Sequence, residues 1–271
     1  MRRSVASVVS VLVASVLVGL CVSVGLWAWA SVGAADGAAD VTEIPADFDV
    51  DYQLGGTNDD LPADVGIVVR DRTESPRDGA FNVCYVNGFQ AQPDARKFWR
   101  HHWRLVLKKN GKPVTDTAWH EWLLDTRTPA RRTALGRILG GWIDGCAEEG
   151  FDAVEFDNLD SFTRSRKMIS RRQGLAFAAI LINRAHKADL LAGQKNLAGY
   201  DGTRIGFDFA VSEECGAWDE CRAYADDFGD QVLAVEYRKK DYRTTCAEFG
   251  DRWPVVLRDR NLTPTGIHRY C

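Results

Sequence analysis

Residues 150–160 read GFDAVEFDNLD, a short apolar run that passes directly into a cluster of polar side chains. Its apolar members Ala153, Val154 and Phe156 can pack in a core as part of a β-strand. Four polar residues gather toward its end: Glu155, Asp157, Asn158 and Asp160. Carboxylates beside a core strand are costly unless they are paired or hydrogen-bonded. In a barrel of alternating strands and helices, chemistry takes place at the carboxyl ends of the strands. The stretch therefore predicts a barrel strand and part of an active site.

Eight further apolar runs have the length and composition of strands. Many of the nine are nearly continuous in apolar residues, as expected for strands covered on both faces. We expect strands at 48–54, 66–70, 81–86, 122–125, 153–157, 190–195, 207–212, 232–237 and 255–258. Nine strands exceed the eight of a closed barrel by one. The first two are joined through GGTN at 55–58, without room for a helix, so we expect irregularity there.

Two helices between these runs have clear boundaries. Thr128 is suited to cap a helix that has Pro129 at its first position and ends at Gly150. Ser170 is suited to cap a second helix, which ends near Lys187. Alternation of strands and helices over this length indicates a parallel sheet with crossover helices. We therefore expect an α/β fold, a (β/α)8 TIM-type barrel preceded by a hydrophobic leader or anchor helix.

The N-terminus carries the pattern of an export signal. Arg2 and Arg3 precede an uncharged, apolar segment, so residues 1–35 are expected to be a cleaved signal peptide or an uncleaved membrane anchor. Either reading places the remainder outside the cell, secreted or held at the outer face of the membrane. Residues 36–46 are small and polar and are interpreted as a linker. Residues 47–271 have the length of one large domain.

Composition and motifs exclude several classes of function. The net charge is −4, and no basic run with interleaved aromatic residues indicates nucleic-acid binding. His120-Glu121 lacks the second histidine of a metalloprotease helix, and no phosphate-binding glycine loop is present. The cysteines lack the close pairs that zinc sites favour. We therefore expect neither a metal nor a cofactor, and contact with a membrane only through an uncleaved N-terminal segment.

Six cysteines lie beyond the leader, an even number that is typical of disulfides in an exported protein. Cys215 and Cys221 form the best pair, because five intervening residues make a natural loop. Cys246 with Cys271 and Cys84 with Cys146 then follow by elimination. The alternative is that these cysteines are buried free thiols.

Polar residues follow nearly every expected strand. They are Asp71, Tyr85, Asn87, Asp125, Asp157, Asn158, Lys195, Asn196, Glu213, Glu236, Tyr237 and Asp259. An apolar strand ends at the first polar residue by definition, and this accounts for part of the pattern. It does not account for the many carboxylates, which instead suit a polar ring at the mouth of a barrel.

Two carboxyl groups facing one pocket are the minimum for glycoside hydrolysis. Asp157 and Glu213 are the best pair by position, because each ends a central strand; Asp160, Asp125 and Glu236 are the reserves. The alternative for Asp157 and Asp160 is that they cap the following loop through its backbone amides.

With these residues in view, the chain resembles glycoside hydrolase family 114, the endo-α-1,4-polygalactosaminidases. The most specific blocks are Cys84–Asn87, Trp122–Asp125, Gly150–Asp160, Gln194–Asn196, Phe207–Cys215, Cys221, Glu236–Tyr237 and Arg258–Asp259. The resemblance implies a TIM-type barrel, endo-cleavage of α-1,4-linked galactosamine polymers, and essential acids at Asp157 and Glu213. Glu214 is an adjacent alternative to Glu213, and only one of the two can face the pocket. Residues 197–200 lack an acidic residue that we expected there.

These observations lead to a hypothesis of retaining hydrolysis of a polysaccharide by a monomer. Asp157 would be the nucleophile and Glu213 the acid/base, with its pKa raised by partial burial. Nine residues are expected to bind substrate: Tyr85, Asp125, Asn158, Asp160, Lys195, Asn196, Glu236, Tyr237 and Asp259. The rivals are a non-catalytic extracellular carbohydrate-binding barrel and a metal-dependent hydrolase using Asp157 and Asp160. Carboxyl groups about 5–5.5 Å apart would indicate retention, and about 6.5–9.5 Å inversion.

Overall fold

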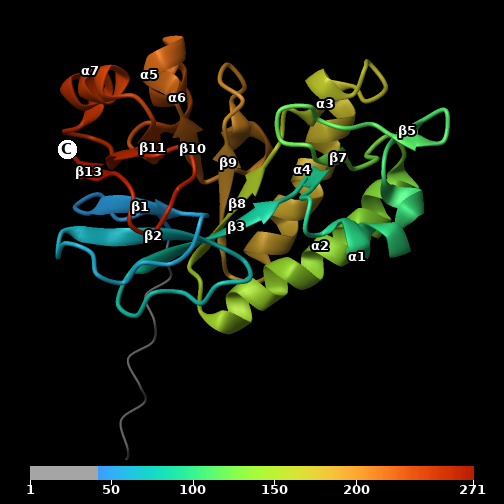
Figure 1. Ribbon diagram of the computed structural model, residues 1–271, viewed down its shortest axis with the longest axis horizontal. Coiled ribbons are helices and arrows are strands. Elements are labelled where there is room, and N and C mark those ends of the chain that lie inside the picture. Colours follow the sequence, from blue (N-terminus) through green and yellow to red (C-terminus); the bar gives the residue numbers. More distant parts are fainter. Residues whose placement is uncertain (1–41) are drawn as a thin grey trace, which may run out of the picture. The chain divides into compact units, whose positions relative to one another are not determined.

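The computed structural model describes residues 42–271 (Figure 1). The expected leader, residues 1–35, and the first part of the linker lie outside the described residues and stay predictions. The end of the expected linker is packed, because Ile44 is buried and its backbone N–H donates to Gln231 Oε1 at 2.7 Å. Across residues 42–271, every helix is too short or too polar to cross a bilayer.

The central feature of residues 42–271 is a nine-stranded sheet in the order β1-β2-β3-β8-β9-β10-β11-β12-β13. The first eight are parallel, whereas β13 (His268–Tyr270) runs antiparallel to β12. The parallel strands are β1 (Asp49–Gln53), β2 (Val65–Asp71), β3 (Phe81–Asn87), β8 (Ala153–Asp157), β9 (Leu191–Lys195), β10 (Phe209–Glu213), β11 (Val232–Glu236) and β12 (Val255–Arg258). This arrangement confirms the predicted TIM-type barrel.

A buried arginine joins the first and last parallel strands. Arg258 of β12 donates through Nη1 to Asp51 Oδ1 of β1 at 3.0 Å and also to the carbonyl oxygen of Tyr52. His268 Nδ1 lies 2.9 Å from the same Asp51 oxygen. Arg258 and Asp51 are both fully buried. Side chains therefore connect the two ends of the parallel series, where the ladder of backbone hydrogen bonds is interrupted.

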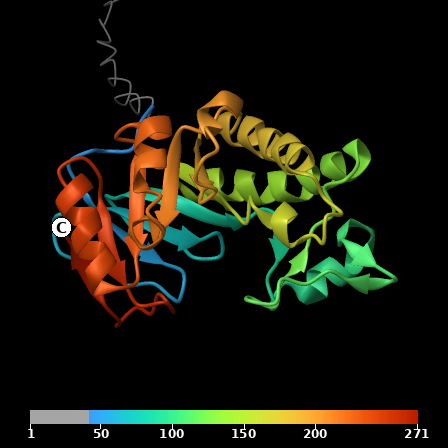
Figure 2. The ribbon, with the colours of Figure 1, turned by 90° about the horizontal axis from the view of Figure 1, so that it is seen from above.

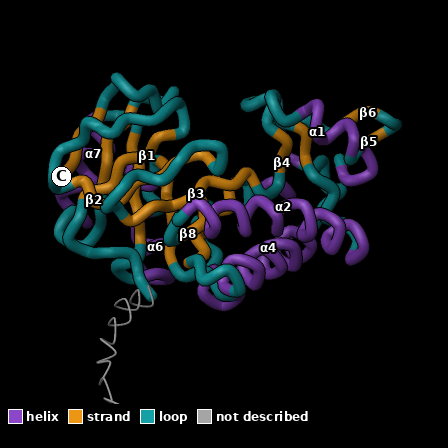
Figure 3. The backbone as a smooth tube through the Cα atoms, turned by 90° about the horizontal axis from the view of Figure 1, so that it is seen from below, coloured by secondary structure: helices purple, strands orange, loops and turns teal. Residues whose placement is uncertain are grey.

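Helices cover only part of the barrel. Within the described chain no helix separates β1 from β2, as the segment at 55–58 indicated, and none separates β2 from β3. The later connections contain α2 (Pro129–Glu149), α3 (Ser161–Arg164), α4 (Arg171–His186), η2 (Gly202–Ile205), α5 (Cys215–Trp218), α6 (Cys221–Phe228) and α7 (Lys239–Phe249). The long helices α2 and α4 lie side by side against β3 and β8 (Figure 3).

The boundaries of α2 and α4 are those predicted from their caps. The Thr128 side chain accepts from the N–H of Arg131, and Gly150 ends α2 in a left-handed conformation with φ +94°. Ser170 and Gln173 form a reciprocal capping box at the start of α4.

The expected strand at 122–125 is wrong as a barrel strand. Trp122–Leu123 (β7) pairs antiparallel with Gln90–Ala91 (β4), outside the main sheet. Both belong to an insertion, residues 88–128, which also contains α1 (Arg96–His101), η1 (Trp103–Leu105), β5 (Lys108–Lys109) and β6 (Lys112–Pro113). Figure 2 shows this insertion, in green, at the end of the domain away from the red C-terminal segment. A short apolar run does not reveal its partner, and here the partner is β4 at the start of the same insertion.

Three disulfides are formed within residues 42–271: Cys84–Cys146, Cys215–Cys221 and Cys246–Cys271. These are the pairs that the sequence favoured. The first connects β3 to α2, the second connects α5 to α6, and the third ties the C-terminal residue to α7.

Candidate active site

Alternation along the strands decides which polar residues enter the barrel. On β10, Phe209 and Val211 belong to the inner core, so Glu213 points to the same interior side. On β8, Ala153 belongs to this inner core, whereas Val154 and Phe156 pack against the helices. The same parity sends Glu155 and Asp157 inward from β8 and Lys195 inward from β9.

A cavity of about 410 Å³ opens at the carboxyl ends of these strands. Its walls include eight of the residues predicted for the site: Tyr85, Asp157, Asn158, Asp160, Lys195, Asn196, Glu213 and Tyr237. Residues that the sequence did not single out also line it: Leu54, Gln92, Glu121, Arg164, Arg260, Asn261 and Leu262. Trp119 lines it as well.

Lys195 joins the two predicted catalytic carboxylates. Its Nζ lies 3.0 Å from Glu213 Oε2 and 3.8 Å from Asp157 Oδ1. These two distances together limit the separation of the two oxygens to about 6.8 Å. Burial acts to lower the pKa of Lys195, but Asp157, Glu213 and Glu155 outweigh it and the pKa is raised. The ammonium, only 2% exposed, is therefore a permanent positive charge between the two carboxylates.

Asp157 is oriented by groups on two sides. The Tyr85 hydroxyl donates to Oδ2 at 2.8 Å, and the backbone N–H of Asn158 donates to Oδ1 at 2.7 Å. Asn158 adopts a left-handed conformation with φ +65°, which asparagine tolerates better than most residues. The carboxylate thus has a fixed direction at the edge of the cavity, about a fifth exposed.

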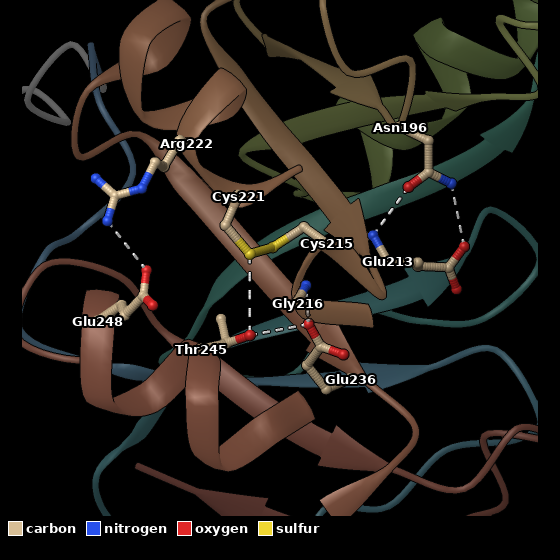
Figure 4. The surroundings of a disulfide bond; sticks show 9 residues. All are labelled: Asn196, Glu213, Cys215, Gly216, Cys221, Arg222, Glu236, Thr245 and Glu248. Atoms are coloured by element: carbon tan, nitrogen blue, oxygen red, sulfur yellow. Dashed lines mark hydrogen bonds and ion pairs between the residues drawn. A yellow bond between two sulfur atoms is a disulfide. The ribbon is translucent and has the colours of Figure 1, made fainter. Parts of the chain in front are cut away.

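Glu213 is held by several donors at once. Asn196 donates through Nδ2 to Glu213 Oε2 at 3.3 Å and accepts from the backbone N–H of Glu213 at 2.8 Å (Figure 4). The Tyr237 hydroxyl donates to Glu213 Oε1. Burial acts to raise the pKa of Glu213, but Lys195 and these hydrogen bonds outweigh it, so the pKa lies below its usual value. The expectation of a raised pKa is wrong, because burial here comes with the cation Lys195 and two further donors, Asn196 and Tyr237.

The adjacent Glu214 is excluded from the cavity wall. It leaves the strand in a left-handed conformation with φ +58°, and its side chain pairs with Arg260 at 2.6 Å. The ambiguity between the neighbouring glutamates is therefore resolved in favour of Glu213.

Three residues predicted to bind substrate lie outside the cavity. Glu236 has the opposite parity to Leu233, Val235 and Tyr237 on β11, so its buried carboxylate points toward the helices. Asp125 is buried in ion pairs with Arg127 and Arg131. Asp259 accepts hydrogen bonds from Asn261 and Thr263 in the turn after β12. Each of these carboxylates is used within the fold.

Glu121 is the most informative residue that sequence reasoning missed. Its Oε2 accepts from Asn87 Nδ2 at 2.9 Å and from Asn158 Nδ2 at 3.4 Å. Burial raises the pKa of Glu121 to about 7, although the Asn87 hydrogen bond acts to lower it. The residue comes from the insertion, not from the end of a barrel strand, so the pattern of strand ends could not reveal it. Trp119, 64% exposed, lines the same cavity.

Asp160 and the cysteines do not provide a convincing metal site. Both Asp160 oxygens accept from Arg164 at 2.7 Å, which leaves them poorly placed as metal ligands beside Asp157. Cys215, Cys221 and Glu236 form a compact group, but the two sulfur atoms are joined in a disulfide and are unavailable as thiolates.

Glu155 lies inside the barrel beneath this cavity and is fully buried. Its Oε1 accepts from the Tyr52 hydroxyl at 2.6 Å, and its Oε2 has no partner among residues 42–271. Burial raises the pKa of Glu155 to about 8, even though Lys195 and Tyr52 act to lower it. A pKa near 8 favours the protonated, neutral form of Glu155 at pH 7, so Asp157 and Glu213 are the main anionic partners of Lys195.

A Glu155→Gln variant, which is isosteric with the neutral acid, tests this assignment. The raised pKa means that the folded wild type keeps a proton that its unfolded chain releases above about pH 4.3. As pH rises, the free energy of unfolding of the wild type should fall relative to that of the variant by up to about 1.4 kcal/mol per pH unit. The difference between the two proteins should level off above about pH 8. Denaturant unfolding from pH 5 to 9 measures this difference. The control is Glu148→Gln, an exposed position on α2. Parallel stability curves would show that Glu155 is ionised in the folded protein.

Comparison with known proteins identifies the family. The model of glycoside hydrolase family GH114 matches residues 32–271. Ega3 from Aspergillus fumigatus, solved in complex with galactosamine, is 21% identical and superposes with a TM-score of 0.66 over 84% of this chain and 96% of that chain. The glycoside hydrolase domain of PelA from Pseudomonas aeruginosa is 16% identical, with a TM-score of 0.57 over 81% and 97%.

At these identities the two structures establish a shared fold, and the sequence matches no curated protein. The family model, in contrast, spans the whole barrel and its cavity. The chain belongs to glycoside hydrolase family 114 and is a glycoside hydrolase.

Proposed function

We propose that this glycoside hydrolase cleaves galactosamine-containing polysaccharide at internal linkages by a two-carboxylate mechanism. The observation that carries the proposal is the meeting of Asp157 and Glu213, from different strands, on either side of Lys195 in one cavity. Two carboxyl groups that flank the scissile bond are the equipment of most glycosidases. The galactosamine in the Ega3 complex supports the choice of sugar.

Asp157 is the nucleophile in this proposal, and Glu213 is the acid/base. Glu213 protonates the departing oxygen while Asp157 attacks the anomeric carbon; water then hydrolyses the glycosyl ester, with Glu213 as the base. The limit of about 6.8 Å between Glu213 Oε2 and Asp157 Oδ1 is compatible with the separation of about 5–5.5 Å between the carboxyl groups of retaining enzymes. Because the pKa of Glu213 is low in the free protein, bound substrate has to raise it. A sugar hydroxyl that takes over the Tyr237 or Asn196 hydrogen bond would do so.

Glu121 and Trp119 provide a way to recognise an amino sugar. An exposed indole offers an apolar face on which a sugar ring can stack. Glu121 Oε2 is occupied by Asn87 and Asn158, so its other oxygen is available to the cavity. A carboxylate at this position can accept a charge-assisted hydrogen bond from the ammonium group of galactosamine.

A Glu121→Gln variant is expected to bind free-amine oligomers about 10-fold more weakly, because hydrogen bonds to charged groups contribute about 1.5–3 kcal/mol. Binding of N-acetylated oligomers should change less than about 2-fold, since the acetamido group is neutral. Glu121 ionises as pH rises through about 7, so its preference for the ammonium form should strengthen in that direction for as long as the sugar amine stays protonated. Calorimetry in an Asp157→Asn background measures both Kd values without turnover. Equal weakening for both oligomers would contradict the assignment.

We further propose that the enzyme acts as a monomer outside the cell, secreted or held at the outer face of the membrane. Three disulfides within residues 42–271 support an oxidising compartment, because cytosolic thiols are kept reduced. The rival reading, a carbohydrate-binding barrel without turnover, is disfavoured by the carboxylate pair with its shared ammonium.

The proposed function is tested by incubating the purified protein with defined galactosamine oligomers, free and N-acetylated, and following products by mass spectrometry. We expect shorter oligomers from internal cleavage, with the free-amine series cleaved faster. Tight binding of intact oligomers without any product would instead support the alternative of a carbohydrate-binding barrel without hydrolytic activity.

A further inference from the structure

A turn in a left-handed conformation follows Glu213 directly. Glu213 is the last residue of β10, and the backbone N–H of Glu214 donates to the carbonyl oxygen of Val235 at 2.8 Å. The chain then reverses through the left-handed Glu214 and enters the four-residue helix α5. Such a short segment depends on its neighbours for a fixed position, because isolated helices of this length are not stable.

Glu236 supports this turn from behind the cavity. Its Oε1 accepts from the backbone N–H of Gly216 at 2.7 Å and from Thr245 Oγ1 at 3.0 Å (Figure 4). Gly216 belongs to α5 and Thr245 to α7, so one carboxylate oxygen on β11 connects three elements. Glu236 is fully buried and has no access to a bound sugar.

The packing around this oxygen leaves no room for a side chain at position 216. A Cβ atom on Gly216 would lie 2.3 Å from Thr245 Oγ1 and 2.9 Å from Glu236 Oε1. Thr245 Oγ1 also lies 3.9 Å from Cys221 Sγ, and Cys221 is bonded to Cys215 at the start of α5. Glycine at 216 is thus required by the close approach of the two side chains.

A buried carboxylate destabilises a fold unless its contacts compensate for lost hydration, and an apolar residue would normally be the more stable choice here. Burial raises the pKa of Glu236, although the contacts with Gly216 and Thr245 act to lower it. The neighbouring Tyr237, on the opposite face of β11, donates to Glu213 itself. The end of β11 therefore contacts Glu213 directly through Tyr237 and indirectly through Glu236 and the turn.

We propose that Glu236 is a positioning residue: through Gly216 and Thr245 it fixes the turn after Glu213, and with it the direction from which Glu213 meets the glycosidic oxygen. The proposal rests on the proposed role of Glu213 as acid/base. It assigns Glu236 to the alignment of the reaction and not to substrate binding.

Four variants test the proposal by steady-state kinetics on galactosamine oligomers. Glu236→Leu should lower kcat about 10–100-fold, because a misplacement of about 1 Å can cost about 100-fold. Thr245→Val, which removes one of the two donors, should lower kcat about 3–10-fold. KM should stay within about 2-fold for both, since neither residue touches the sugar. Glu236→Gln keeps an oxygen that can accept both hydrogen bonds, so it should retain kcat within about 3-fold. Thr244→Val is the control: Thr244 is exposed on α7 beside Thr245, and this variant should behave as wild type.

A folded Glu236→Leu variant with wild-type kcat would overturn the proposal, as would a rise in KM at unchanged kcat. If Glu236→Leu fails to fold, the kcat and KM of Thr245→Val decide the question in the same way. A second readout is independent of turnover: NMR titration of the Glu213 carboxyl should show its low pKa rising toward the usual value in Thr245→Val and not in Thr244→Val. An unchanged Glu213 pKa would also overturn the proposal. Wild-type protein that cleaves no oligomer would instead refute the proposed function, and the titration would still decide whether Glu236 positions Glu213.

Discussion

Replacing Asp157 with asparagine is expected to lower kcat on galactosamine oligomers by about 1,000-fold or more, equivalent to about 4 kcal/mol of lost transition-state stabilisation. The amide has almost the same shape, can accept from the Asn158 N–H through its oxygen and can donate through its NH2 group to the Tyr85 hydroxyl, but it cannot form the glycosyl ester. The loss should therefore appear in kcat, whereas oligomer binding persists.

Asp160→Asn is the matched control for this loss. Asp160 lines the same cavity, but both of its oxygens already accept from Arg164. We expect its effect to stay within about 10-fold, the scale of one substrate hydrogen bond. Initial rates by mass spectrometry and thermal melts of both variants separate chemistry from folding. An Asp157→Asn variant of full activity would remove Asp157 from the mechanism.

Replacing Lys195 with methionine is expected to impair both stability and activity. Lys195 is the buried cation shared by Asp157 and Glu213, and removal of one partner of a buried ion pair typically costs about 3–5 kcal/mol. Activity at pH 7 should fall at least about 100-fold, because the proposed nucleophile Asp157 has to be ionised to attack and loses the ammonium that stabilises its negative charge.

The stability deficit of Lys195→Met should depend on pH. Without the ammonium, the folded-state pKa values of the flanking carboxyl groups rise, so the folded variant takes up protons that its unfolded chain releases. The deficit should therefore be largest near pH 8 and shrink toward pH 5, where the carboxyl groups are neutral. Denaturant unfolding at both pH values measures it, with Lys187→Met, exposed after α4, as the control. A deficit that is independent of pH would mean that Lys195 acts through packing alone.

The sequence was most informative where a strand runs directly into its functional residues. The stretch at 150–160 predicted β8, and the repetition of polar residues after other strands led to Lys195, Glu213 and Tyr237. Period-two alternation then explains why Glu213 and not Glu214 faces the cavity.

Sequence patterns did not predict the position of a residue where that position depends on contacts between distant segments. Glu236 and Tyr237 both follow an apolar run, and only the register of β11 shows that Glu236 faces the helices. Residues 122–124 are apolar like a barrel strand, but Trp122 and Leu123 pair with Gln90–Ala91 at the start of the insertion. Glu121 reaches the cavity from an insertion whose path no local pattern encodes.

The central claim is tested most directly by the anomeric configuration of the first product. Proton NMR of α-1,4-galactosamine oligomers, recorded during the first minutes of hydrolysis by the wild-type enzyme, distinguishes the two reducing-end anomers before they equilibrate. A double displacement with Asp157 as nucleophile and Glu213 as acid/base predicts that the α anomer appears first. The β anomer as first product would contradict this account, because water would then attack directly and Asp157 would form no bond to the sugar.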